Sequence, residues 1–202
     1  MTETETDVAS GALLGRAKQG RERILTACEQ TIARAGIRGF RMQDVASTAG
    51  VSIGLLAYHF GDRDGLLQAA LDHVTERAAD RATHSADATT AATRLAALLC
   101  SEFGRDPEIR AGSIAWNELR ALAVFEPAQA AAVARSTAAW QRTVHELIAE
   151  AVQDRGGDLD PAAAALILTA LVEGLSGRWL TGQVTAEEAQ VSVREAIRGL
   201  GL

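Results

Sequence analysis

The sequence predicts an all-α protein of nine or ten helices, and three features of the chain lead to this expectation. Its apolar residues recur at intervals of three and four positions, which places side chains on one face of a helix. Alanine and leucine, which favour helices, are abundant, and the 202 residues include only three prolines. The length suits a small N-terminal domain and a larger C-terminal domain with a core of its own.

Residues 1–17 are expected to form a disordered N-terminal arm, because they show no apolar periodicity. The acidic start Met1-Thr2-Glu3-Thr4-Glu5 is also unlike a signal peptide, which would be basic and then apolar. The first helix is expected from about Lys18 to Ala35, with Gly36 as its C-cap. No run of the sequence approaches the ~20 apolar residues needed to span a bilayer, so a cytoplasmic protein with no membrane partner is expected.

Residues 42–63 have the pattern of two short helices joined by a tight turn. Gly50 is expected to end the first helix in the left-handed conformation, and Val51 to fill the angle between the helices. Ser52 is expected to cap the second helix, Ile53 to Phe60, in which the ring of Phe60 is buried. This arrangement is typical of a helix-turn-helix, whose second helix enters the major groove of DNA.

The net charge of −6 first argues against a nucleic-acid partner, but the distribution of charge reverses that argument. Residues 10–60 carry seven basic and three acidic side chains, a net charge of +4. Positive charge beside a helix-turn-helix is what the neutralisation of phosphates requires. The alternative is that these arginines form only a solvated helix face.

Capping residues predict the helices that follow the motif. Asp62 is expected to cap a fourth helix that links the two domains, and Leu95 to Phe103 to define a fifth. Each of the three prolines follows an acidic residue and marks a helix start. The remaining helices are expected at Pro107 to Ala111, Ser113 to Val124, Pro127 to Arg155, Pro161 to Leu180, and from the capping box Thr185-x-x-Glu188 to about Arg198.

The motif region resembles the TetR family of transcriptional regulators in its individual residues. The matching positions are Arg23-Ile24-Leu25, Val45-Ala46, Ala49-Gly50-Val51-Ser52, Gly54, Leu56, Tyr58-His59-Phe60, Arg63 and Leu66-Leu67. The resemblance implies a three-helix DNA-binding domain at residues 18–78, with its motif at about 41–60. It also implies a ligand-binding and dimerisation domain at residues 79–202, and a repressor that leaves a palindromic operator when a small molecule binds.

The expected partner of the motif is double-stranded operator DNA. The residues expected to contact it are Arg41, Met42, Gln43, Ser52, Ile53, Gly54, Leu55, Ala57, Tyr58, His59 and Arg63. The family usually has threonine where Arg41 stands and often an aromatic residue where Ala57 stands. Arg41 can reach a phosphate but cannot cap a helix, and Ala57 offers only a methyl group to a base. These departures leave another interpretation open, in which the protein is TetR-like but acts through protein contacts without binding DNA.

The two helices expected at about 127–155 and 161–180 are more apolar than their own chain could easily bury. Symmetric pairing of these helices would give a four-helix bundle, so a homodimer is predicted. The alternative is that their apolar faces all belong to the core of one domain.

The C-terminal domain is expected to bind a small-molecule effector of unknown identity. By resemblance, the residues that surround its cavity are Phe103, Trp116, Asn117, Arg120, Trp140 and His73. Aromatic walls with a few polar groups suit such a pocket, although each tryptophan alone could be core packing. A tryptophan together with Glu118 could hold a cation.

The sequence contains no enzyme motif, and neither a cofactor nor a metal is expected. The four histidines are scattered, and His73 with Asp80 or His84 would offer only two or three metal ligands at weak spacing. Cys28 and Cys100 lie on apolar stripes and are predicted to be buried, unpaired thiols, with a redox-sensing pair as the alternative.

Overall fold

The computed structural model of the protein describes residues 3–83, 89–156 and 158–202. Within these ranges the chain forms nine α-helices and no strand, which confirms the all-α class. The helices are α1 (Glu3–Gly39), α2 (Met42–Ala49), α3 (Ile53–Phe60), α4 (Arg63–Thr83), α5 (Ala91–Cys100), α6 (Pro107–Ala123), α7 (Pro127–Arg155), α8 (Pro161–Leu180) and α9 (Ala186–Gly199).

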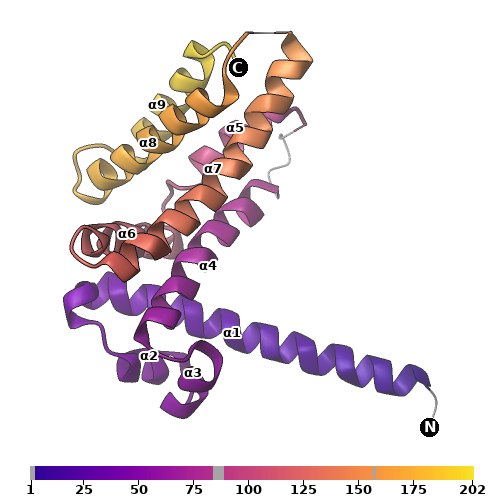
Figure 1. Ribbon diagram of the computed structural model, residues 1–202, viewed down its shortest axis with the longest axis vertical. Helices are drawn as coiled ribbons and strands as arrows, with labels where there is room; N and C mark the ends of the chain where they lie inside the picture. The colour runs from indigo at the N-terminus through magenta and orange to yellow at the C-terminus, as the bar shows by residue number, and fades with distance from the viewer. Residues whose placement is uncertain (1–2, 84–88, 157) are drawn as a thin grey trace.

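The helices form an elongated molecule with the helix-turn-helix at one end. Figure 1 shows α1, α2, α3 and the start of α4 together at that end, and α5, α8 and α9 at the other. The long helix α7 runs between them, and α6 packs against both α1 and α7. Because α4 leads from α3 to α5 and α6, it connects the motif with the C-terminal half.

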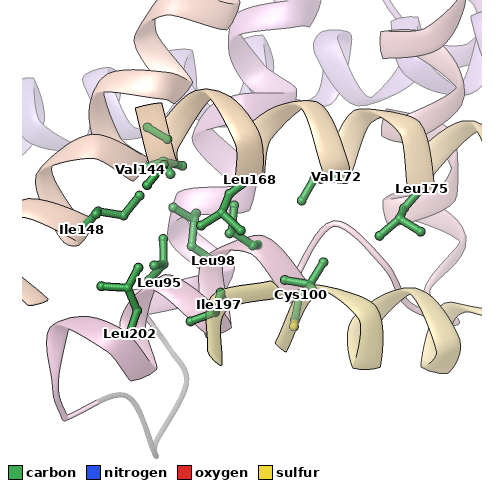
Figure 2. Close-up of a cluster of buried hydrophobic side chains, with 14 of the residues drawn as sticks. Leu95, Leu98, Cys100, Val144, Ile148, Leu168, Val172, Leu175, Ile197 and Leu202 are labelled. Carbon is green, nitrogen blue, oxygen red and sulfur yellow. The ribbon is translucent and has the colours of Figure 1, made fainter. Parts of the chain in front are cut away.

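Two clusters of buried apolar side chains hold these helices together. The C-terminal core joins α5, α7, α8 and α9, and Figure 2 shows Leu95 and Leu98 of α5 close to Leu168 of α8. The N-terminal core joins α1 to α4, but it also includes Trp116 and Leu119 of α6. Helix α6 is therefore packed into the same core as the helix-turn-helix, and the expected boundary between residues 78 and 79 does not separate two independent cores.

Helix α1 differs from the expectation at its start. The structure continues the helix back to Glu3, whereas the sequence predicts that it begins at about Lys18 after an N-terminal arm at residues 1–17. Met1 and Thr2 lie outside the described residues. A helix that is already nucleated in a packed core can extend through alanine, leucine and glutamate without an apolar stripe. Figure 1 shows this extension projecting away from the rest of the molecule.

The other end of α1 is interrupted where the sequence predicts it. Gly36 has a φ of 65° and a ψ of 170°, which breaks the regular helix before residues 37–39. Glu118 of α6 compensates for the break, because its Oε2 accepts a hydrogen bond of 2.7 Å from the Ile37 backbone N–H. This contact ties the end of α1 to α6.

Helix α6 is one continuous helix, whereas the sequence predicts two, Pro107 to Ala111 and Ser113 to Val124. Gly112 lies inside the helix, where a Cβ atom would make an ordinary van der Waals contact with both methyl groups of Val74 at 3.5 Å. The packing of α6 in the protein therefore outweighs the weak helix propensity of glycine at this position.

Helix α8 is long and apolar enough to cross a bilayer by length and composition, contrary to the expectation from the sequence. It packs on α7, α9 and α6, and 39% of its most apolar stretch is buried within the described protein. Core helices of globular proteins have the same composition, so this feature carries no conclusion about a membrane. Its exposed side carries Leu166 and Ile167, which are 60% and 54% exposed.

Cys28 and Cys100 are free and buried, as predicted. Cys28 belongs to the N-terminal core and Cys100 to the C-terminal core, so the two thiols are not neighbours. Burial raises the pKa of both thiols and keeps them protonated. No group of three or more metal-ligating side chains occurs among the described residues, and His84 lies outside them.

Candidate nucleic-acid interface and effector cavity

The turn between α2 and α3 is built as the sequence predicts. Gly50 adopts the left-handed conformation with a φ of 66° and ends α2, and the half-buried Val51 follows it. The Ser52 hydroxyl accepts a hydrogen bond of 3.2 Å from the Leu55 N–H and so caps α3. Arg41, at the N-cap of α2, makes no capping hydrogen bond with its side chain, as its chemistry implies.

Helix α3 attaches to the protein through one side and leaves the other side open. Leu56 is fully buried in the N-terminal core, whereas Ile53, Leu55 and Tyr58 are exposed, Tyr58 by 83%. A helix that is apolar and yet mostly exposed is suited to contact another molecule. Of the residues predicted to contact DNA, the exposed ones are Arg41, Gln43, Ser52, Ile53, Gly54, Leu55, Ala57, Tyr58 and His59, while Met42 and Arg63 are half-buried.

Two cation–π contacts fix arginines beside the motif. The Arg63 guanidinium lies 5.8 Å from the ring centre of Phe40, and the Arg21 guanidinium lies 5.7 Å from the ring centre of Phe60. Such contacts hold the cation close to the end of α3 while leaving its N–H groups able to donate to phosphates.

The end of α3 depends on a close approach of two backbones. A Cβ atom at Gly65 of α4 would lie 2.1 Å from the carbonyl oxygen of Phe60, so only glycine fits there. Asp62 caps α4 by accepting a hydrogen bond of 2.9 Å from the Gly65 N–H, as predicted. The orientation of α3 relative to α4 is thereby set by backbone contacts.

The prediction that the ring of Phe60 is buried in the core is wrong. Phe60 is only half-buried, because its ring lies under the Arg21 guanidinium at the surface, and Leu56 is the residue that anchors α3.

We expect Leu56→Ala to lower the free energy of unfolding by about 2 to 5 kcal/mol, and Phe60→Ala to lower it by clearly less. Urea unfolding followed by circular dichroism measures both. An equal cost for the two substitutions would contradict this assignment.

A narrow cavity of about 30 Å³ lies between α4, α6, α7 and α8. Its lining residues are Val74, Thr75, Glu102, Ser113, Trp116, Trp140, Val172, Glu173 and Ser176. Two indole rings and two carboxylates therefore face a space bounded by four helices.

The structure brings only part of the predicted effector site together. Trp116 and Trp140 line the cavity, and two further residues lie behind its wall: Asn117 donates a hydrogen bond of 2.9 Å to the Ser176 hydroxyl, and Arg120 pairs with Glu173 at 3.2 Å. Trp140 Nε1 is buried and has no hydrogen-bond acceptor among the described residues.

Two of the predicted effector residues lie elsewhere. Phe103 is fully buried in the C-terminal core, where its ring packs edge-on against Trp179 with 5.9 Å between ring centres. His73 lies on a different side of α4, buried 4.0 Å from the carboxylate of Glu29 on α1. Glu118, predicted as a cation ligand, is instead engaged with the Ile37 N–H. Sequence periodicity shows which residues share the buried face of a helix, but it does not show which neighbouring helix covers that face.

Sequence reasoning missed the two acids of the cavity, Glu102 and Glu173. Burial raises the pKa of Glu102 to about 7, although the positive charge of Arg81 opposes this shift. Each acid follows an apolar stretch, Leu98-Leu99-Cys100 for Glu102 and Leu171-Val172 for Glu173. An acid at the inner edge of an apolar helix was the available signal, because an unpaired carboxylate is costly there unless it serves a site.

An exposed helix in a helix-turn-helix, together with a cavity with aromatic and acidic walls between α4, α6, α7 and α8, is typical of a ligand-responsive DNA-binding regulator. Comparison with known proteins agrees with this class. The family "Bacterial regulatory proteins, tetR family" matches residues 24–70, and "BetI-type transcriptional repressor, C-terminal" matches residues 94–201. The chain belongs to the TetR family of transcriptional regulators, and its C-terminal half is of the BetI type.

Several transcriptional regulators are similar to this chain over most of its length. The HTH-type transcriptional regulator BetI of Burkholderia thailandensis is 31% identical over 172 residues, which are 84% of each chain. A TetR-family regulator from Rhodococcus sp. has a solved structure with 44% identity and a TM-score of 0.85, covering 91% of this chain and 98% of that one. A regulator from Saccharomonospora viridis, solved in complex with choline, has 25% identity and a TM-score of 0.72, covering 90% and 96%.

Proposed function

We propose that the protein is a dimeric, cytoplasmic repressor that binds a palindromic operator and leaves it when a small organic cation enters the cavity. The observation that carries the DNA-binding part is α3, which is anchored by Leu56 and presents an exposed face from Ile53 to Tyr58. Two such helices in successive major grooves require half-site centres about 34 to 36 Å apart.

The exposed face of α8 supports the dimer. Ala163, Leu166, Ile167, Ala170 and Gly174 recur at helical spacing on the side of α8 that no other described element covers. A Cβ atom at Gly174 would meet nothing within 4 Å, so another helix could approach closely there. An open groove of about 450 Å³ runs along the alanine-rich start of α7 and the end of α6. A second copy of α7 and α8 would cover this apolar surface by two-fold pairing.

The composition of the cavity supports a cationic effector. Indole rings attract cations through their faces, and Trp116 and Trp140 line the cavity together with the acids Glu102 and Glu173. The buried Nε1 of Trp140 favours an effector that also carries an oxygen acceptor. Choline, which the related Saccharomonospora viridis regulator binds, combines a quaternary ammonium with a hydroxyl group.

The position of Trp116 supports coupling between the cavity and the DNA-binding half. Trp116 lines the cavity and also belongs to the N-terminal core that holds α1 to α4. A cavity of about 30 Å³ has room for little more than a few water molecules, so an effector must move its walls. Movement of α6 or α4 would change the spacing of the two recognition helices, and a coupling of about 1 to 3 kcal/mol would weaken operator binding 5- to 150-fold.

Binding to the DNA that flanks the protein's own gene tests this function. We expect specific binding at low salt, steep loss of affinity as salt rises, and a 5- to 150-fold weaker affinity in millimolar choline. Fluorescence anisotropy of labelled DNA measures all three, and sodium chloride at equal ionic strength controls for screening. Binding that choline leaves unchanged would reject the effector. The absence of any protected palindrome in footprinting would favour the reading in which the protein acts through protein contacts.

A further inference from the structure

A group of charges next to the effector cavity connects it with α1: Glu29 is fully buried, Arg77, Arg81 and Glu102 are half-buried, and Glu108 is exposed. Glu29 of α1, Arg77 and Arg81 of α4, Glu102, and Glu108 of α6 line a second cavity of about 10 Å³. This second cavity shares Val74, Glu102 and Ser113 with the effector cavity. The carboxylate of Glu102 therefore borders both spaces. We call these five charged residues the charge cluster.

The charge cluster has one more negative than positive group when all five are ionised. Arg77 serves two carboxylates at once, because its Nη1 lies 3.5 Å from Glu29 Oε2 while its Nη2 contacts Glu108. Glu29 is 1% exposed, and its second oxygen has no hydrogen-bond partner among the described residues. The Nε of Arg81 is likewise buried without a partner there. Ionised Glu29 is therefore strongly unfavourable, because it is fully buried and shares the cation Arg77 with Glu108.

Apart from Arg77 and Arg81, none of the described groups that act on the pKa of Glu29 is positively charged. His73 lies 4.0 Å away, but burial and the charge of Arg77 lower its pKa and keep it neutral at pH 7. The charged groups around His73 also include the cation Arg21 and the acids Glu22 and Asp80.

The surroundings of Glu102 leave its charge uncompensated as well. Arg81 is the cation whose charge lowers the pKa of Glu102, and Arg81 also interacts with Glu29 and Asp106. Glu173, which also lines the effector cavity, is already paired with Arg120. Burial raises the pKa of Glu102, and also that of Glu29, to about 7.

We propose that the charge cluster binds one proton in the effector-free protein and releases it when a cationic effector occupies the adjacent cavity. Proton and effector compete because either one compensates the same excess negative charge. The proton passes to solvent, and Glu102 turns to the effector as a carboxylate. This inference rests on the proposed cationic effector, but the proton site itself can be tested without an effector.

Calorimetry with choline tests the exchange. At pH 7 we expect choline binding to release up to one proton, seen as a binding heat that depends on the ionisation enthalpy of the buffer. Affinity should rise about tenfold per pH unit below pH 7 and level off near pH 8. Glu102→Gln should remove the proton release, whereas Glu150→Gln, which changes an exposed carboxylate on α7, should keep the wild-type profile. Binding of choline without proton release would overturn the exchange and leave the effector class intact.

Thermal unfolding without choline tests the proton site separately. A carboxyl whose pKa is raised by folding binds more protons in the folded state, so the wild-type melting temperature should fall as the pH rises from 5 to 8. Glu29→Gln and Glu102→Gln should match the wild type at pH 5 and exceed it at pH 8. Melting curves that stay parallel across this range would overturn the proton site. Absence of choline binding with the expected melting behaviour would reject only the effector.

Discussion

Replacing Ile167 by glutamate is expected to separate the dimer and to reduce operator affinity by at least about 100-fold. A charged side chain on the apolar face of α8 would be buried against its own copy in the partner, where burial of an unpaired charge costs several kcal/mol. A monomer holds only one half-site, so most of the specific affinity is lost. Because Ile167 is 54% exposed in the single chain, the fold should remain intact.

Analytical ultracentrifugation and anisotropy with operator DNA measure the two effects of Ile167→Glu. Val191→Glu is the matched control, since Val191 is 53% exposed but lies on α9, outside the proposed interface. It should leave a dimer of wild-type affinity. An Ile167→Glu protein that remains a dimer would show that α8 is not the interface.

Replacing Tyr58 or His59 by alanine is expected to abolish operator binding with little change in stability. Hydrogen bonds to charged groups such as phosphates contribute about 1.5 to 3 kcal/mol each. In a two-fold dimer the loss occurs at both half-sites, so affinity should fall by more than about 100-fold. Both side chains are exposed, so their removal leaves no cavity.

Tyr58→Phe separates the contribution of the hydroxyl group from that of the ring. It should weaken binding if the hydroxyl meets a phosphate, and leave it unchanged if only the ring packs against DNA. Circular dichroism melting should give wild-type stability for both alanine variants. A large loss of stability in His59→Ala would mean that the assumed orientation of α3 is wrong.

Much of the fold could be predicted because the deciding signals are local. Gly50, Ser52 and Asp62 cap or end their helices through contacts within a few residues, and the structure has all three. Both Pro127–Arg155 and Pro161–Leu180 begin and end where the sequence predicts. The differences arose where tertiary packing or helix propagation decides. Gly112 lies inside a helix that packing in the protein stabilises, and α1 extends through residues without an apolar stripe.

The effector cavity was predicted less well because it depends on distant contacts. Trp116 and Trp140 were found as large aromatic residues on inward helix faces, but Phe103 has the same pattern and lies in the core. Glu102 lies in the segment after α5 and Glu173 on α8, far apart in sequence, and tertiary packing brings them to one space. The role of His73 depends on α4 packing on α1, and that of Glu118 on α6 packing on α1, which local sequence does not encode.

Reciprocity between operator and effector tests the central claim, that the cavity and the recognition helices are coupled. Choline can be titrated into the protein alone and into its operator complex while the fluorescence of Trp116 and Trp140 is followed, since both rings line the cavity. Operator should weaken choline binding by the same factor, about 5- to 150-fold, by which choline weakens operator binding. Equal choline affinity with and without operator would contradict the coupling.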